Sequence, residues 1–141
     1  MAVINPNNDL YLVDQDNGTP ILIGSNIINA EFSADGGSLL YNSPYDIYTY
    51  SIGDKTKNLI TRLAQKVETA SWYKDYEHIW FVSDNTIKNI EIDSRPIINV
   101  IDFKKLSAPV QNFTYDANAN MIYYYQLNNG ALSIHQLAVG N

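Results

Sequence analysis

The chain of 141 residues has no cysteine, only two histidines and few charges. Disulfide frameworks are therefore excluded, and the shortage of thiols and imidazoles disfavours a zinc site. Charged residues make up 17% of the sequence, against roughly 25% in typical soluble domains. Lys and Arg number 9 and Asp and Glu 15, with a pI near 4.6. This acidic balance argues against binding to nucleic acid, whose phosphates attract basic surfaces.

Long apolar runs are also missing. No stretch approaches the roughly 18 apolar residues of a membrane span, and no basic-then-apolar signal segment opens the sequence. As written, the sequence predicts a cytoplasmic protein, or an exported one if it belongs to a larger bacterial protein. The chain is nevertheless 45% hydrophobic and 12% aromatic with a net charge of −6. Such a composition predicts a folded domain with a substantial core.

A repeat organises the sequence. Three segments start with an aromatic residue that is followed three positions later by aspartate: Phe32 with Asp35, Trp72 with Asp75, and Phe113 with Asp116. The leading aromatics stand 40 and 41 residues apart, which suits a four-stranded propeller blade of roughly 40–45 residues. Helical repeats have a similar length, but short runs of Ile, Val, Thr and Tyr alternate here with the period of strands.

The repeat predicts an all-β protein made of β-propeller blades. In each blade, four antiparallel strands a to d would run outward from the centre. Strand a is expected near 28–33, 68–73 and 110–115; strand b near 2–5, 38–42, 78–83 and 121–126; strand c near 9–14, 46–51, 86–92 and 131–137; strand d near 20–24, 57–63 and 96–103. The resulting order, bcd-abcd-abcd-abc, is about 3.5 blades in a single domain, 1–141. The expected blades cover 1–24 (incomplete), 27–63, 67–103 and 110–141 (incomplete).

The first complete repeat has a familiar pattern. Ala30-Glu31-Phe32-Ser33-Ala34-Asp35-Gly36-Gly37-Ser38-Leu39-Leu40-Tyr41, followed by Asp46-Ile47-Tyr48, resembles the TolB-like, WD-like bacterial propeller repeat. The second repeat departs from this pattern, because Trp72-Tyr73 replaces Phe-Ser and both glycines are lost. The resemblance implies a propeller, a fold that commonly serves as a binding platform. It names no ligand, because a fold does not determine a function.

The repeated residues have expected structural roles. In each a–b turn, the carboxylate can accept hydrogen bonds from nearby backbone N–H groups, and Gly36 permits a positive φ. The aromatic three residues earlier is expected to pack between neighbouring blades. The predicted structural set is Phe32, Asp35, Gly36, Trp72, Asp75, Phe113 and Asp116.

Three and a half blades cannot close a ring, because propellers have about four to eight blades. Open strand edges and apolar blade faces would then invite pairing with another chain. Two copies could close a ring of seven or eight blades with two-fold symmetry, so a homodimer is predicted. A piece of a longer propeller and a single chain closed as four irregular blades are the alternatives.

No catalytic constellation stands out. His78 and His135 are not tied by spacing to a serine, and no cysteine is present. Glu31 and Glu68 lie one residue apart in repeat register on strand a, which lines a propeller channel, and are weak candidates for ligand contacts. Segment 14–18 faintly resembles a calcium loop but lacks its full spacing, and a hairpin turn explains it as well. Neither a metal nor a cofactor is predicted.

The sequence therefore predicts a non-catalytic binding or scaffold module that self-associates and presents loops or a channel to a protein, peptide or glycan. One alternative is a carbohydrate-active propeller that uses acidic channel residues. The other is a fragment of a larger exported propeller protein.

Overall fold

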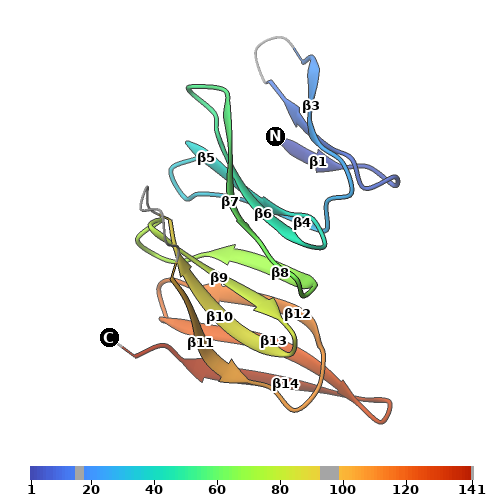
Figure 1. Ribbon diagram of the computed structural model, residues 1–141, viewed down its shortest axis with the longest axis vertical. Coiled ribbons are helices and arrows are strands. Elements are labelled where there is room, and N and C mark those ends of the chain that lie inside the picture. Colours follow the sequence, from blue (N-terminus) through green and yellow to red (C-terminus); the bar gives the residue numbers. More distant parts are fainter. Residues whose placement is uncertain (15–17, 93–98, 141) are drawn as a thin grey trace. The chain divides into compact units, whose positions relative to one another are not determined.

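The computed structural model describes residues 1–14, 18–92 and 99–140, and within these every regular element is a β-strand (Figure 1). The all-β prediction is confirmed. No helix in these residues is long and apolar enough to cross a membrane. The strands are β1 (Ala2–Ile4), β2 (Leu10–Val13), β3 (Pro20–Gly24), β4 (Asn29–Phe32), β5 (Ser38–Asn42), β6 (Asp46–Ser51), β7 (Thr56–Arg62), β8 (Val67–Trp72), β9 (His78–Ser83), β10 (Thr86–Glu91), β11 (Val100–Lys105), β12 (Val110–Asp116), β13 (Met121–Asn128) and β14 (Ala131–Ala138).

The strands form four antiparallel sheets in which neighbours in sequence are neighbours in space. The orders are β1-β2-β3, β4-β5-β6-β7, β8-β9-β10-β11 and β12-β13-β14. The predicted succession of three, four, four and three strands is therefore confirmed. Each strand returns beside its predecessor through a short connection, so every sheet is assembled from local hairpins.

The described chain divides into two compact units, Met1–Val67 and Glu68–Asn141. Unit 1 contains the sheets β1–β3 and β4–β7. Unit 2 contains the sheets β8–β11 and β12–β14.

In unit 1 the core lies between the two sheets. Leu10 of β2 is buried together with Ile27, and with Leu39, Tyr41 and Tyr50 of the second sheet. These residues follow the period-two alternation that turns every second side chain of a strand to one face. Burial of such apolar surface contributes roughly 25 cal/mol per Å², which makes face-to-face packing the main stabilising term.

The core of unit 2 is larger and richer in aromatic residues. Its buried members from the two sheets and their connections are Trp80, Val82, Ile87, Leu106, Val110, Phe113, Tyr115, Ile122, Tyr124 and Val139. Tyr73 packs edge-to-face on Trp80, with ring centroids 5.9 Å apart. Consecutive sheets thus pack face to face in both units.

Two hairpins have tight turns with left-handed backbone at both central positions. Asp84 and Asn85 join β9 to β10 with φ values of 50° and 52°, and Asn129 and Gly130 join β13 to β14 at 48° and 80°. Such turns match the right-handed twist of the strands, and Asn, Asp and Gly tolerate them best. The Asn129-Gly130 turn therefore fixes the register of the β13–β14 hairpin.

Candidate functional site

The repeated aspartates lie in the turns between the first and second strands of three sheets. Asp35 accepts hydrogen bonds from the Ser33 hydroxyl at 2.6 Å and from the Gly37 N–H at 2.9 Å. These two hydrogen bonds hold the pKa of the Asp35 carboxyl below its usual range. The carboxylate therefore stabilises its own turn.

The other two aspartates bind their turns in the same way. Asp75 accepts from the N–H groups of Glu77 and His78 at 2.9 and 3.1 Å, and contacts His78 Nδ1 at 2.8 Å. Asp116 accepts from the N–H groups of Asn118 and Ala119 at 2.9 and 3.0 Å. Because the lone pairs are occupied by local donors, all three carboxylates act within the turns that contain them.

The position after the aspartate has left-handed backbone in the first two repeats. Gly36 has a φ of 72°, and Tyr76, which replaces it in the second repeat, has a φ of 57°. The turn thus keeps its conformation without glycine, although a side chain at positive φ is costly. The edge-to-face contact between Tyr76 and Trp72, with centroids 5.9 Å apart, supports the bulky residue there.

Replacing Gly36 with alanine is expected to destabilise unit 1 by about 1–2 kcal/mol, because a Cβ is disfavoured at positive φ. Steric contact is not the cause, since nothing lies within 4 Å of the added Cβ. Gly53→Ala is the matched control: its site is equally open and has no positive φ, so stability should change by no more than about 0.5 kcal/mol. Urea unfolding followed by far-UV circular dichroism measures both variants. Equal losses for the two would contradict this account.

The motif aromatics do not share one environment. Trp72 and Phe113 are buried, and Phe113 belongs to the core of unit 2. Phe32 is 36% exposed, because it borders a cavity in unit 1 and is not enclosed between two sheets.

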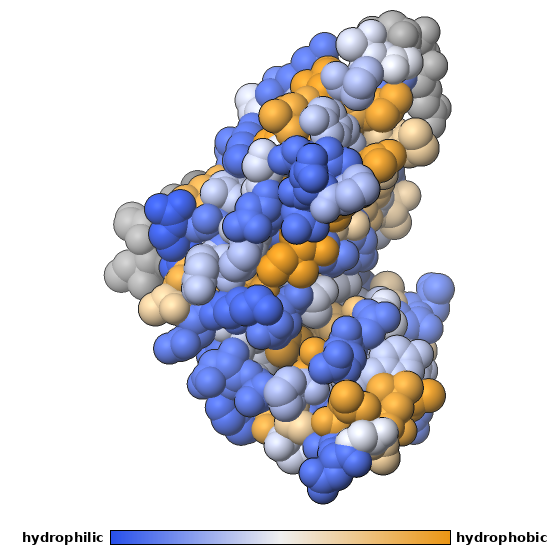
Figure 2. All heavy atoms as spheres, turned by 90° about the vertical axis from the view of Figure 1, so that its right-hand side faces the viewer, coloured by the Kyte–Doolittle hydropathy of each residue, from blue (hydrophilic) through white to orange (hydrophobic). Residues whose placement is uncertain are grey.

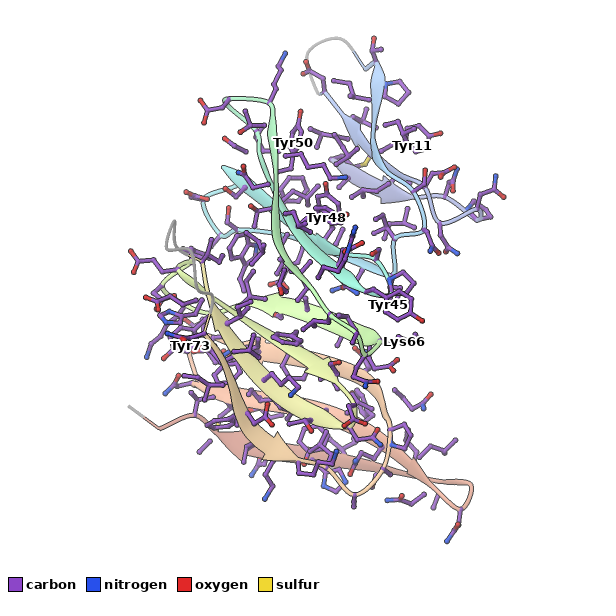
Figure 3. The ribbon with its side chains drawn as sticks, viewed as in Figure 1. Tyr11, Tyr45, Tyr48, Tyr50, Lys66 and Tyr73 are labelled. Carbon is purple, nitrogen blue, oxygen red and sulfur yellow. The ribbon has the colours of Figure 1, made fainter. Side chains whose placement is uncertain are left out.

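This cavity lies within unit 1. It has a volume of about 580 Å³, within the range of roughly 300–1,000 Å³ typical of ligand pockets. It is bordered by β2 and β3 of the first sheet. In the second sheet it is bordered by the β4–β5 connection, the β6–β7 connection and the strand ends beside them. Its lining residues are Met1, Leu12, Val13, Asp14, Ile21, Phe32, Gly36, Tyr50, Ile52 and Lys55. Tyr50 is labelled in Figure 3.

The lining is mainly apolar, with charges of both signs. Asp14 and Lys55 provide one carboxylate and one ammonium group, and the amino group of Met1 donates to the Val13 carbonyl at 3.1 Å. Ligand sites commonly combine an apolar wall with a few polar groups that fix orientation. Sequence reasoning did not find this cavity, because its residues come from distant turns and only Phe32 and Gly36 belong to the repeat motif.

The two glutamates proposed for a channel lie on the first strands of the second and third sheets. Glu31 is on β4 in unit 1 and Glu68 is on β8 in unit 2, and both are half-buried. Each interacts with other groups of the protein. Their convergence in one channel stays a prediction.

The described residues contain no group of three or more His, Asp or Glu side chains that could hold a metal ion. Residues 15–17 of the calcium-like segment 14–18 lie outside the part of the chain that the structure describes.

The sequence analysis did not identify a serine–histidine pair that the structure contains. Ser133 Oγ lies 2.9 Å from His135 Nε2 on β14, because residues two apart on a strand share one face. The imidazole also stacks on Tyr124, with centroids 5.0 Å apart and planes inclined by 10°. Catalysis would further require a group that orients the imidazole and donors for an oxyanion. The described residues place no carboxylate on His135 Nδ1.

No family model and no curated protein sequence matches this chain. Solved structures do match it. The β-propeller domain of Cps50 (Swd1) from Myceliophteria thermophila is 12% identical with a TM-score of 0.73, covering 99% of this chain and 51% of its own. A putative TolB from Agrobacterium tumefaciens is 15% identical with a TM-score of 0.74, covering 97% and 56%. TolB from Acinetobacter baumannii is 20% identical with a TM-score of 0.64, covering 92% and 35%.

The class that these findings define is the β-propeller. At such low identities the similarity shows the fold alone, and the chain spans about half the length of the first two structures. Other similar structures are a nidogen/laminin complex and a mitotic checkpoint complex, and also a putative 6-phosphogluconolactonase from Bacteroides uniformis and the tricorn protease. The propeller fold thus occurs in binding proteins as well as in enzymes. The function of this chain therefore has to be inferred from its site and not from its fold.

Proposed function

We propose that this protein is a non-catalytic propeller module of the TolB-like, WD-like type, which binds a partner and associates with a second copy of itself. The observation that carries the binding function is the cavity of about 580 Å³ in unit 1. Its apolar wall suits the side chains of a peptide or of an extended protein segment, whose burial supplies the main driving force. Asp14 and Lys55 would orient polar groups of that segment.

The motif turns support a display function. The aspartate hydrogen bonds keep the β4–β5 turn in one conformation, and Gly36 of this turn borders the cavity. Rigid sheets that hold short connecting loops are a common arrangement for recognition, because little conformational freedom is lost on binding.

A displayed library of random peptides tests the binding function. Peptides enriched on the purified protein are expected to bind Ile21→Trp at least about tenfold more weakly, because the indole fills the cavity that Ile21 lines. Leu59→Trp, at an exposed position of β7 in the same unit, should bind them as the unmodified protein does. Fluorescence anisotropy with a labelled peptide gives the dissociation constants. Equal affinity for all three proteins, or no enrichment, would overturn the assignment of the cavity.

Self-association is the second part of the proposal. The four sheets of the described residues have fourteen strands, the equivalent of three and a half four-stranded blades. Two copies would bring twenty-eight strands, enough for seven four-stranded blades or for eight sheets of three or four strands. Strand edges and apolar sheet faces of an open array favour such pairing. Light scattering on a sizing column should give a mass near twice 15.9 kDa over a wide concentration range. A constant mass of one chain would contradict self-association and leave the cavity proposal intact.

The alternative is catalysis on a carbohydrate by Glu31 and Glu68. A glycan array distinguishes the two functions: binding of a glycan that Glu31→Gln retains, with no hydrolysis by either protein, favours the binding module. Cleavage that Glu31→Gln abolishes would establish the enzyme.

A further inference from the structure

The last sheet has one largely apolar face that none of the described residues of unit 2 covers. The register of β12, β13 and β14 turns Phe113, Ile122 and Tyr124 into the core, and the alternate residues to the opposite face. This opposite face carries Met121, Tyr123, Tyr125, Leu127, Leu132 and Ile134, all half-buried or exposed. In Figure 2, apolar side chains gather at the bottom of the view, where the β13–β14 hairpin lies in Figure 1.

The first sheet of the chain has an uncovered apolar face as well. Leu10 and Leu12 of β2 point into the core of unit 1, so the alternate residues of the three strands turn away from it. These are Val3, Tyr11 and Leu22, whereas Val13 borders the cavity described above. Val3 and Leu22 are exposed, and Tyr11 is labelled in Figure 3. Further apolar side chains appear at the top of Figure 2, where β1 and β3 lie in Figure 1.

Both faces lack the charges that usually mark a solvent-exposed sheet. Of the strand residues on them, only Asp116 is charged, and its carboxylate is bound to the β12–β13 turn. Sheet faces that remain in water normally alternate apolar residues inside with polar residues outside. The polar residues Asn112, Thr114 and Gln136 share the face of β12–β14 with the tyrosine and aliphatic side chains. A shortage of charges together with tyrosine side chains is typical of a buried interface.

We propose that the outward face of β12–β14 on one copy packs against the outward face of β1–β3 on a second copy. This inference rests on the self-association proposed above and names its surfaces. The same packing exists twice within the chain, where the face of an earlier sheet covers the face of the next sheet in both unit 1 and unit 2. A second copy brings a face of the required kind, already shaped as a twisted propeller sheet.

The stoichiometry follows from the pairing of unlike faces. Each copy has one face of each kind, so two copies cover all four faces if the ring closes. The interface is therefore formed twice, related by the two-fold axis. Pairing of like with like, such as edge association of two β14 strands, would leave the β1–β3 face in water.

Glutamate on either face is expected to prevent association. Leu22→Glu and Ile134→Glu each bury a charge in one of the proposed contacts. Their matched controls are Leu59→Glu and Ile101→Glu: Leu59 is 51% exposed against 55% for Leu22, and Ile101 60% against 69% for Ile134. Each control lies in the same unit as its partner variant but on an outer strand, β7 or β11, away from the proposed faces. Light scattering should give one chain mass for the first two variants and twice that mass for the controls.

A mixing experiment separates unlike from like pairing. Leu22→Glu retains its β12–β14 face and Ile134→Glu retains its β1–β3 face, so the mixture has one intact contact. We expect the mixture to form heterodimers at concentrations where each variant alone is monomeric. Circular dichroism establishes that both variants are folded, and Val3→Glu with Leu132→Glu form a second pair if one of them is not.

The outcomes are distinct. A monomeric unmodified protein overturns both self-association and this inference. If the unmodified protein is a dimer but Leu22→Glu is also a dimer, self-association stands and the assignment of faces is wrong. If the mixture stays monomeric, the one intact contact between a β12–β14 face and a β1–β3 face does not form, and the assignment of these faces is wrong. Filaments of indefinite length would overturn closure into a two-copy ring.

Discussion

Phe113→Ala is expected to destabilise unit 2 by about 3–5 kcal/mol, whereas Phe32→Ala should cost unit 1 about 1 kcal/mol or less. The two phenylalanines occupy the same position of the repeat, but Phe113 is 6% exposed and Phe32 is 36% exposed. Truncation of Phe113 removes its apolar contacts and leaves a void among Tyr115, Ile122 and Tyr124, which the sheets can fill only in part.

Urea unfolding measures this contrast. Both tryptophans, Trp72 and Trp80, lie in unit 2, so their fluorescence reports on that unit, and far-UV circular dichroism reports on both units. The fluorescence midpoint should fall strongly for Phe113→Ala and stay in place for Phe32→Ala. Similar losses for the two variants would mean that the motif aromatic has one role in all repeats. Phe32→Ala should in addition weaken peptide binding, because Phe32 lines the cavity.

Raising the pH from 10 towards 12 is expected to unfold the protein, because several buried tyrosines must stay protonated in the folded state. Burial, with the charges of Tyr48 and Tyr50, raises the pKa of Tyr41, and burial and the Tyr73 hydroxyl raise the pKa of Tyr115 to about 12. Burial also raises the pKa of Tyr48 and of Tyr124.

The free energy of unfolding falls with rising pH because proton binding is coupled to folding. A tyrosine in the unfolded chain has a pKa near 10. Below pH 10 the tyrosines are therefore protonated in both the folded and the unfolded state, and they do not make the free energy of unfolding depend on pH. Above pH 10 the unfolded chain loses these protons first, and the free energy of unfolding falls until the folded pKa is reached. For Tyr115 this window runs from about pH 10 to about pH 12.

Tyr41→Phe is expected to move the alkaline transition of unit 1 to higher pH and to preserve or raise stability at pH 7. Among the residues that the structure describes, the buried Tyr41 hydroxyl has no hydrogen-bond partner, so its removal relieves a desolvation cost. The ring still stacks on Tyr48, at 5.3 Å between centroids.

Tyr45→Phe is the matched control, since Tyr45 lies in the same unit and is exposed. It should leave the alkaline transition unchanged. Far-UV circular dichroism between pH 8 and 12.5, with absorbance at 295 nm to follow tyrosinate, measures both variants. A transition that Tyr41→Phe does not shift, or a loss of stability at pH 7, would contradict the assigned cost of the buried hydroxyl.

Most of the strands could be predicted from the sequence, because propeller sheets are built from local hairpins. Period-two alternation and turn residues placed the strand near 46–51, which the structure has at Asp46–Ser51. Local signals were weaker at the last strand of the third sheet, predicted near 96–103 and observed at Val100–Lys105. Residues 96–98 of the predicted strand lie outside the part of the chain that the structure describes. At its other end, the pairing of Lys105 with Thr86 extends the strand two residues beyond the predicted position 103.

The sequence by itself determined the number of strands, their order and the turn chemistry at Asp35, Asp75 and Asp116, because each depends on residues within one hairpin. Only the tertiary structure decided that Phe113 is enclosed and Phe32 borders a cavity, that Ser133 meets His135, and that two apolar sheet faces lie uncovered. These features depend on how whole sheets pack. The free energy of such packing is set by shape and buried area between residues distant in sequence, which a repeat pattern does not encode.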